Sequence, residues 1–203
     1  MPQLDPTLYR TPFSAAYWRS ALADFKQVRI LAFAALMIAA CTALSYIPSI
    51  PVGDAGVKVT WGFLARSVCS LVGGPVTALV FGFAEDTISY LLHPTGPYFP
   101  GYALTTMLGT LIYALFLYRA KLTPGWMLVR VFLAKMFTNI LNVLLGSLWS
   151  SILYGKGYLY TMTISFWKNL TMLPVQTVML FFLLTALLPV LRRMGLVPSS
   201  KKG

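Results

Sequence analysis

Long runs of apolar residues dominate this sequence, and they decide the solvent in which it can fold. Hydrophobic residues make up 58% of the 203 residues and charged residues 10%, which is more apolar material than one soluble core of this size can hide. A helix needs about 20 apolar residues to cross about 30 Å of hydrocarbon. The sequence therefore predicts an all-α integral membrane protein with six transmembrane helices. The expected spans are about 28–46, 59–72, 75–92, 102–118, 127–150 and 166–191.

The basic residues indicate how these spans are oriented. The net charge of +11 would suggest a nucleic-acid partner in a soluble domain. Here most Lys and Arg residues flank the apolar runs, where they set orientation and meet anionic lipid headgroups, so we expect membrane lipid and no nucleic acid. The positive-inside rule then places both termini in the cytoplasm, with Lys58 and Lys156 in outer loops. The residues expected on the inner side are Arg10, Arg19, Lys26, Arg29, Arg119, Lys121, Arg192, Arg193, Lys201 and Lys202.

These spans divide the chain into a cytoplasmic or interfacial segment 1–27, a six-helix transmembrane domain 28–191 and a basic cytoplasmic tail 192–203. The N-terminal segment has no apolar core beside a small-residue cleavage site, so we do not expect a removable signal peptide. The aromatic spacing within 12–26 favours an interfacial helix, and a polar leader without helix is the alternative. The residues that carry this spacing are Phe13, Tyr17, Trp18, Leu22 and Phe25.

Some chemistries have no support in the sequence. Cys41, Cys69 and His93 lack the spacing of a zinc site, so no metal is expected, and the two cysteines lie in apolar runs rather than in a disulfide framework. The chain contains no nucleophile elbow, P-loop or HExxH motif. We therefore expect a protein that is not an enzyme and has no cofactor of its own. A membrane enzyme using His93 or Asp86 is a minor alternative.

Polar residues inside the spans are costly and indicate a cavity or a helix contact. In the fifth span they recur at helical spacing, within about an 80° sector of one face. They could join helices through amide hydrogen bonds, but the tryptophan at the outer end favours a surface for a planar heterocyclic ligand. Lys168, Asn169 and Gln176 extend this surface onto the sixth span. The residues on the face of the fifth span are Lys135, Asn139, Asn142, Gly146 and Trp149.

The loop HPTGPYFPG at 93–101 contains turn formers and aromatic residues without Lys or Arg. If both termini are cytoplasmic, this loop faces outward and suits a pocket lid, with Tyr98, Phe99 and Tyr102 near the ligand. The alternative is that these rings are interfacial anchors. The segment IPSIPVGDAGVK after the first span is expected to be another loop, because its prolines and glycines cannot continue a helix.

Three ionisable residues lie at similar depth in neighbouring spans: Arg66, Glu85 and Asp86. Leaving any of them unpaired would cost several kcal/mol, so we expect a structural ion pair between Arg66 and one acid, with the other acid facing the cavity or a hydroxyl. A proton or sodium relay through these acids is the alternative. In the first span, Ala35, Ala39 and Ala43 form a small-residue strip that lets another helix approach closely.

Several motifs together resemble a known family. The stretch GGPVTALVFGFAEDTISYLLHPTGPYFPGYALTTMLGTLIYALFLY is similar to the folate-family S components of energy-coupling-factor (ECF) transporters. The residues that match directly are Gly74, Pro75, Asp86, Pro94, Gly96, Tyr98, Phe99, Pro100 and Gly101. Further matches are Asn142, Leu148, Trp149, Tyr154 and Gly155 around the end of the fifth span, and Lys168, Asn169, Met172, Pro174 and Gln176 in the sixth. The resemblance covers roughly residues 28–185.

The resemblance implies a six-helix substrate-binding subunit with an outward-facing pocket in a bacterial cytoplasmic membrane. It would bind folate or a related vitamin and dock through Ala35, Ala39 and Ala43 on a transmembrane coupling protein with two ABC ATPases. Gly146, Ser147 and Ser165 depart from the family pattern, so an S component for another vitamin is an alternative. An ion-coupled secondary transporter using Glu85 and Asp86 is a separate alternative. The expected substrate-binding residues are Trp61, Arg66, Tyr98, Phe99, Asn139, Asn142, Trp149, Lys168 and Asn169.

Overall fold

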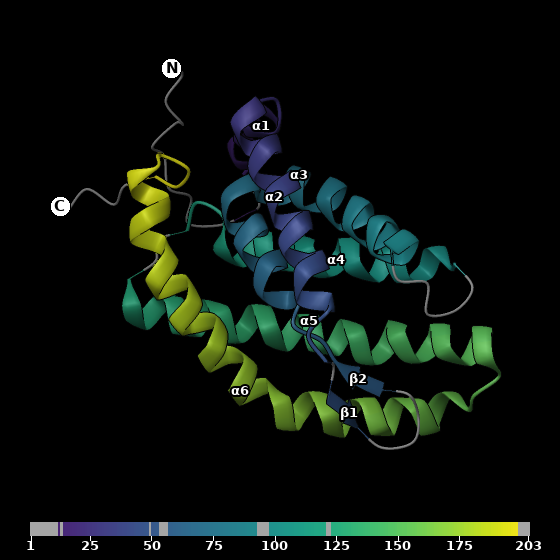
Figure 1. Cartoon of the computed structure of the whole chain (residues 1–203). Helices are drawn as coiled ribbons and strands as arrows, with labels where there is room; N and C mark the ends of the chain where they lie inside the picture. The colour runs from purple at the N-terminus through teal and green to yellow at the C-terminus, as the bar shows by residue number, and fades with distance from the viewer. Residues whose placement is uncertain are drawn as a thin grey trace.

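The structure is a computed structural model that describes residues 12, 14–48, 50–52, 57–92, 98–120 and 123–198. Within these residues the chain forms six helices and one short antiparallel hairpin. Helices α3, α4, α5 and α6 contact one another in chain order, and α2 packs on α3 (Figure 1). The elements are α1 (Ala15–Phe25), α2 (Val28–Ser45), β1 (Ile50–Val52), β2 (Val57–Val59), α3 (Phe63–Leu92), α4 (Pro100–Leu117), α5 (Pro124–Tyr154) and α6 (Tyr158–Arg193).

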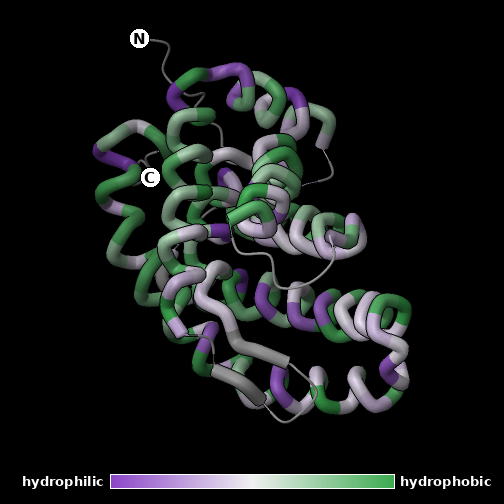
Figure 2. Tube along the Cα trace, turned by 45° about the vertical axis from the view of Figure 1, so that its right-hand side comes forward, coloured by the Kyte–Doolittle hydropathy of each residue, from purple (hydrophilic) through white to green (hydrophobic). Residues whose placement is uncertain are grey.

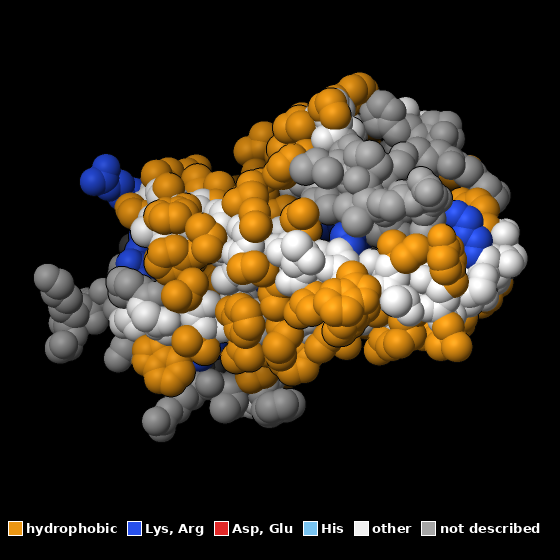
Figure 3. Space-filling model, turned by 90° about the horizontal axis from the view of Figure 1, so that it is seen from below, with side chains coloured by type: hydrophobic (Ala, Val, Ile, Leu, Met, Phe, Trp, Pro, Cys, Tyr) orange, Lys and Arg blue, Asp and Glu red, His pale blue; other side chains and the backbone are white. Residues whose placement is uncertain are grey.

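Five of these helices, α2 to α6, are long and apolar enough to cross a membrane. The face seen from below in Figure 3 is largely hydrophobic, and its Lys and Arg side chains lie mainly near the two ends. This distribution places apolar side chains against lipid and charges near the headgroups. The chain is therefore a multi-pass membrane protein with a helical transmembrane domain.

The second and third expected spans form two helical segments of α3 that meet at Gly74, whose φ and ψ are not helical. The break at Gly74 agrees with the expected boundary between these two spans, and because α3 includes both of them, the described residues contain five helical elements of membrane length rather than six. Gly74 has φ +72° and ψ −175°, which interrupts the helix and changes the direction of the chain within one residue. A Cβ atom at Gly74 would lie 2.8 Å from the ring of Tyr118, so both the backbone angle and the packing require glycine.

Two further predictions need correction. The loop expected after the first span contains the hairpin of β1 and β2, in which Ile50 pairs with Val59. The sixth helix begins at Tyr158 rather than near residue 166, because only 155–157 interrupt the helices. Gly155 ends α5 in a left-handed conformation, and the apolar residues after Gly157 then start α6.

The largest cluster of buried apolar side chains joins α2 to α6 and is called the apolar core below. On α6 it contains Leu180, Leu184, Leu188 and Leu191, which recur at helical spacing. On α5 it contains Met127, Val131 and Ala134. The apolar core therefore lies near the start of α5 and the end of α6. The end of α5 and the start of α6 are left for polar side chains.

The short helix α1 lies outside the membrane-length helices and confirms the helix predicted within 12–26. Its N-cap Ser14 accepts a hydrogen bond from the backbone N–H of Tyr17, and the Tyr17 hydroxyl donates to the carbonyl oxygen of Ala114. Tyr17 and Ala21 are buried, whereas Trp18 and Leu22 are exposed. Hydrophilic residues appear along α1 in Figure 2. Its position at a membrane surface stays a prediction, and Phe13 lies outside the described residues.

A buried ion pair fixes α1 to the end of α4. Asp24 accepts a hydrogen bond of 2.6 Å from the Tyr118 hydroxyl and an ion-pair contact of 2.9 Å from Arg119, and all three side chains are buried. Burial raises the pKa of Tyr118 above its usual range, and the Asp24 carboxylate raises it further, so the hydroxyl remains a donor. This cluster also holds the Tyr118 ring against Gly74 at the kink of α3.

Candidate ligand-binding cavity

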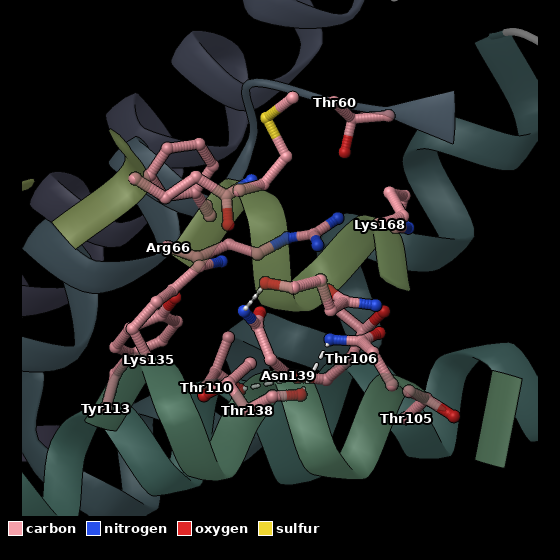
Figure 4. Close-up of a pocket in the computed structure, with 16 residues that line it drawn as sticks. Thr60, Arg66, Thr105, Thr106, Thr110, Tyr113, Lys135, Thr138, Asn139 and Lys168 are labelled. Atoms are coloured by element: carbon pink, nitrogen blue, oxygen red, sulfur yellow. Dashed lines mark hydrogen bonds between the residues drawn. The ribbon is translucent and has the colours of Figure 1, made fainter. Parts of the chain in front are cut away.

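A polar cavity of about 150 Å³ lies among α3, α4, α5 and α6 (Figure 4). It adjoins the apolar core. On α5 the lining residue Lys135 directly follows the core residue Ala134, and on α6 the lining residue Gln176 lies one turn before the core residue Leu180. The lining residues are Thr60; Phe63 and Arg66 of α3; Thr105, Thr106, Gly109, Thr110 and Tyr113 of α4; Lys135, Thr138, Asn139 and Asn142 of α5; and Lys168, Asn169, Met172 and Gln176 of α6.

Helical spacing explains why these residues meet. The lining residues of α5 are spaced i, i+3, i+4 and i+7, which places them on one face, and α6 presents a similar face. Figure 2 shows hydrophilic residues recurring along α5. The Asn139 amide of α5 donates to the Asn169 carbonyl oxygen of α6 at 3.3 Å and so joins the two polar faces directly. Asn142 instead donates to the Thr138 carbonyl oxygen within α5.

The ion pair at the cavity wall joins Arg66 and Glu85. The Arg66 guanidinium donates two hydrogen bonds of 3.0 Å to the two Glu85 carboxylate oxygens, a bidentate geometry that favours a strong pair. Ser89 donates a further hydrogen bond to Glu85 at 3.3 Å. Asp86 accepts a hydrogen bond from the Thr106 hydroxyl at 3.1 Å. Arg66 thus pairs with one acid, while a hydroxyl contacts the other.

Lys135 is the deepest cation of the cavity by burial, with 5% of its surface exposed. Its ammonium nitrogen lies 4.4 Å from the centroid of the Phe63 ring, within the range of a cation–π contact. Figure 4 shows Lys135 beside Tyr113 and across the cavity from Lys168. Together with Arg66, these lysines give the cavity a basic wall.

The aromatic residues expected at the ligand do not line this cavity. Trp149 donates its indole N–H to the Thr105 hydroxyl at 2.9 Å and packs on Phe99 with ring centroids 5.4 Å apart. Gly101 makes this packing possible, because a Cβ atom there would lie 2.3 Å from Phe99 and 2.7 Å from Trp149. Trp149 thus contacts the cavity-lining residue Thr105 without lining the cavity itself, and its role in binding stays a prediction.

The other two aromatic residues of the predicted set lie elsewhere. Tyr98 packs against Tyr90, with ring centroids 5.1 Å apart, and 40% of its surface is exposed. Trp61 donates its indole N–H to the Pro48 carbonyl oxygen at 3.3 Å. The structure therefore gathers five of the nine expected binding residues around the cavity. They are Arg66, Asn139, Asn142, Lys168 and Asn169.

Sequence reasoning missed the contribution of α4. Thr105, Thr106, Thr110 and Tyr113 line the cavity, and the Thr110 hydroxyl contacts the Ala78 carbonyl oxygen of α3 at 2.8 Å. Their spacing of i, i+1, i+5 and i+8 gives one polar side to an otherwise apolar span. Because threonine commonly bonds to its own helix backbone in membranes, this signal is weaker than that of Asn or Lys.

Comparisons with known proteins bear on what occupies this cavity. No protein-family model matches the chain. The chain is 26% identical over 156 residues to the folate transporter FolT of Clostridium novyi, covering 77% of this chain and 88% of that protein. It is 28% identical over 156 residues to the folate transporter FolT of Leuconostoc mesenteroides, covering 73% and 83%. A crystal structure of FolT bound with folic acid superposes with a TM-score of 0.66 at 26% identity, covering 77% of this chain and 91% of that chain.

The chain is a homologue of the FolT folate transporters. This confirms the resemblance to the folate family that the motifs indicate. The agreement in fold extends over most of both chains, so the helices that build the cavity belong to a FolT-like arrangement. Homology to transporters also agrees with the expectation that the chain is not an enzyme. The individual binding residues remain predictions.

Proposed function

We propose that this FolT homologue is the substrate-binding membrane subunit of an ECF-type transporter and captures folate outside the cell. One observation carries the proposal: a basic, amide-rich cavity lies within the membrane-length helices of a chain whose fold matches FolT bound with folic acid. Buried cations and amides are expensive among apolar helices, which supports a binding role rather than a purely structural one.

Folate suits the chemistry of this cavity. It has a flat pterin head with hydrogen-bonding edges and a tail with two carboxylates. A cavity of about 150 Å³ is comparable to one that holds a single benzene ring, so it accommodates part of the head and not the whole vitamin. The rest of the ligand would extend past Lys168 of α6, whose ammonium group complements a carboxylate. Asn139, Asn142 and Asn169 would meet the polar edges of the ligand.

Glu85 and Asp86 support this reading over ion-coupled transport. The Glu85 carboxylate is occupied by two hydrogen bonds from Arg66, and Asp86 accepts one from Thr106. A carboxylate that binds and releases a proton or sodium ion in each cycle would have to break such a bidentate pair each time. The pair therefore fits a structural role.

Uptake would depend on a separate energising module, made of a transmembrane coupling protein and two ABC ATPases. Ala35, Ala39 and Ala43 are exposed on α2 and line an apolar surface groove of about 590 Å³ together with residues of α2 and α3. Such a strip of small side chains suits close contact with a partner helix. A bacterial cytoplasmic membrane with both termini inside is the location that fits the distribution of Lys and Arg and the bacterial relatives.

Titration of the purified protein with folic acid tests the proposal. Binding would be followed by tryptophan fluorescence and by calorimetry in detergent. Lys168→Ala should weaken binding at least tenfold, because it removes a charge-assisted contact to the tail. Lys156→Ala is the matched control, since Lys156 lies in the turn between α5 and α6 and does not line the cavity.

A wild-type protein that binds no folic acid but binds another flat vitamin would contradict the folate assignment and retain the transporter subunit. Docking is tested separately by Ala39→Leu. This change should abolish vitamin uptake in cells that contain the energising module, while folic acid binding to the purified subunit stays unchanged. Loss of both activities would contradict a docking role for the strip.

A further inference from the structure

Three arginines lie where the start of α2 packs against the end of α6, and they are called the arginine cluster below. Arg29 is the second residue of α2, and Arg192 and Arg193 are the last two residues of α6. The apolar core holds these helix ends together, because it includes Ile30 of α2 and Leu196 just after α6. The end of α6 lies on the same side of the molecule as both termini (Figure 1).

A tight turn after α6 brings the chain back to Arg29. Gly195 has φ +66°, and its backbone N–H donates to the Arg192 carbonyl oxygen at 3.0 Å. The Leu196 N–H donates to the Leu191 carbonyl oxygen at 2.9 Å, which completes a Schellman motif. The Nη1 atom of Arg29 lies 3.6 Å from the position that a Cβ atom on Gly195 would occupy. The Arg29 guanidinium therefore lies against the turn that closes the helix of the other two arginines.

The arginine cluster has no anionic partner within the described residues. The Nε atom of Arg192 is buried and lacks a hydrogen-bond partner in this part of the chain, which is costly for a charged group. The described acids Asp24, Glu85 and Asp86 are each engaged elsewhere. Helix α2 also begins without a side-chain cap or an acidic residue in its first turn, so the positive end of its dipole adds to the charge of Arg29. An anion from outside the chain would offset this charge.

Exposed apolar side chains beside the arginine cluster indicate which anion fits. Val28 and Leu31 are exposed at the start of α2, and Val190 and Met194 are exposed at the end of α6. Both helices are long and apolar enough to cross a membrane, so these side chains face acyl chains while the guanidinium groups lie near the headgroups. A phospholipid presents a phosphate directly above its acyl chains. The cluster and its apolar surroundings match that order of charge and hydrocarbon.

We propose that the arginine cluster binds the phosphate headgroup of an anionic phospholipid in the inner leaflet, with the acyl chains along α2 and α6. Guanidinium groups form charge-assisted and often bidentate hydrogen bonds with phosphate oxygens. Basic pockets between transmembrane helices on the cytoplasmic side commonly bind anionic lipids. None of the three arginines lines the polar cavity, so the inference does not depend on what the cavity binds. It depends on the orientation with both termini inside.

Titration with phosphatidylglycerol tests the proposal, using the full-length protein in a nonionic detergent. Native mass spectrometry would count the bound lipid, and phosphatidylcholine with the same acyl chains serves as the lipid without net charge. Phosphatidylglycerol should bind at least tenfold more tightly than phosphatidylcholine. Arg29→Gln and Arg192→Gln should each weaken it on the order of fivefold, because each removes one cation. Arg192→Lys retains the charge and should bind more tightly than Arg192→Gln.

Arg19→Gln is the matched control, because Arg19 is an exposed arginine of α1 outside the cluster. Its affinity for phosphatidylglycerol should equal that of the wild type. Folic acid binding by every variant should also be unchanged, which checks folding independently of the lipid. Arg29 is exposed, so Arg29→Gln provides a separate test if Arg192→Gln does not fold. A wild type that binds phosphatidylglycerol but no folic acid would contradict the proposed function and leave this inference standing.

Four outcomes would overturn the inference. Equal affinity for the two lipids would show that the headgroup charge is not recognised. An equal loss for Arg19→Gln and Arg29→Gln would show diffuse surface charge rather than a site. Displacement of phosphatidylglycerol by inorganic phosphate at equal concentration would show a phosphate site that needs no lipid. If the wild type binds no phosphatidylglycerol and Arg29→Gln lowers assembly with the energising module, the cluster meets an acidic protein segment instead.

Discussion

Replacing Glu85 with glutamine should destabilise the protein strongly, because it removes the charge that balances Arg66 beside the cavity. Breaking a buried ion pair by removing one partner costs about 3–5 kcal/mol. The Glu85 side chain is 3% exposed, whereas the Arg66 side chain is 30% exposed and can be partly solvated through the cavity. We therefore expect the lower end of that range, about 3 kcal/mol. For a chain of this size that corresponds to a decrease in Tm of about 6–12 °C.

The assay is thermal unfolding in detergent without ligand, with Asp86→Asn as the matched control. Asp86 is the adjacent acid and accepts a hydrogen bond from Thr106, so its replacement should cost only about 1 kcal/mol. The double variant Arg66→Met/Glu85→Leu removes both charges and should recover part of the loss. A decrease in Tm for Glu85→Gln no larger than for Asp86→Asn would refute the view that this pair stabilises the helices.

Three other predictions concern the helix kink and the cluster that fixes α1. Gly74→Ala should destabilise the fold by about 2–4 kcal/mol, because φ is +72° and the new Cβ would meet the Tyr118 ring at 2.8 Å. Gly146→Ala, whose new Cβ would meet no side chain and no other helix within 4 Å, should be neutral or stabilising, and equal Tm values for the two variants would contradict the packing argument. Asp24→Asn should cost about 3–5 kcal/mol by leaving the buried Arg119 without its carboxylate; an unchanged denaturant midpoint would show that α1 is not held by this pair. Burial raises the pKa of Tyr118, so Tyr118 of the unfolded chain ionises near pH 10, before Tyr118 of the folded protein does. The contribution of the buried Tyr118 hydroxyl to stability is therefore complete below about pH 10 and is lost as the pH rises further. Tyrosine absorbance at alkaline pH, compared with Tyr118→Phe, measures the effect, and a lower pKa in the folded protein would contradict it.

The sequence predicted helix positions well where an apolar run ended at a strong signal. The first span ends close to its predicted boundary, since prolines and glycines follow Tyr46. The start of α6 was missed because YLYTMTI is apolar but follows two glycines, and the glycines suggested a longer interruption. The break at Gly74 was recognised from the glycines and the proline at 73–75. How closely the chain packs at this break depends on residues far away in the sequence, here on the Tyr118 ring.

The candidate site shows a similar division. Asn139, Asn142, Lys168 and Asn169 could be found from the sequence, because amides and cations rarely occur within apolar spans without a purpose. The placement of Trp149 could not be found in this way. Its aromatic character suggested a ligand contact, but its indole N–H is satisfied by Thr105, and Gly101 lets its ring pack closely beside α4. Several neighbours on other helices determine that orientation.

Hydropathy and charge depend on the local sequence, so the sequence by itself determined that the chain folds in a membrane, roughly where its helices lie and which residues are too polar to face lipid. The partners of those polar residues were decided only by the tertiary structure. Arg66 meets Glu85 across 19 residues, Asp24 meets Arg119 across 95, and Asn139 meets Asn169 across 30. Such pairings depend on the rotation and depth of each helix against its neighbours, which the packing of the whole bundle sets.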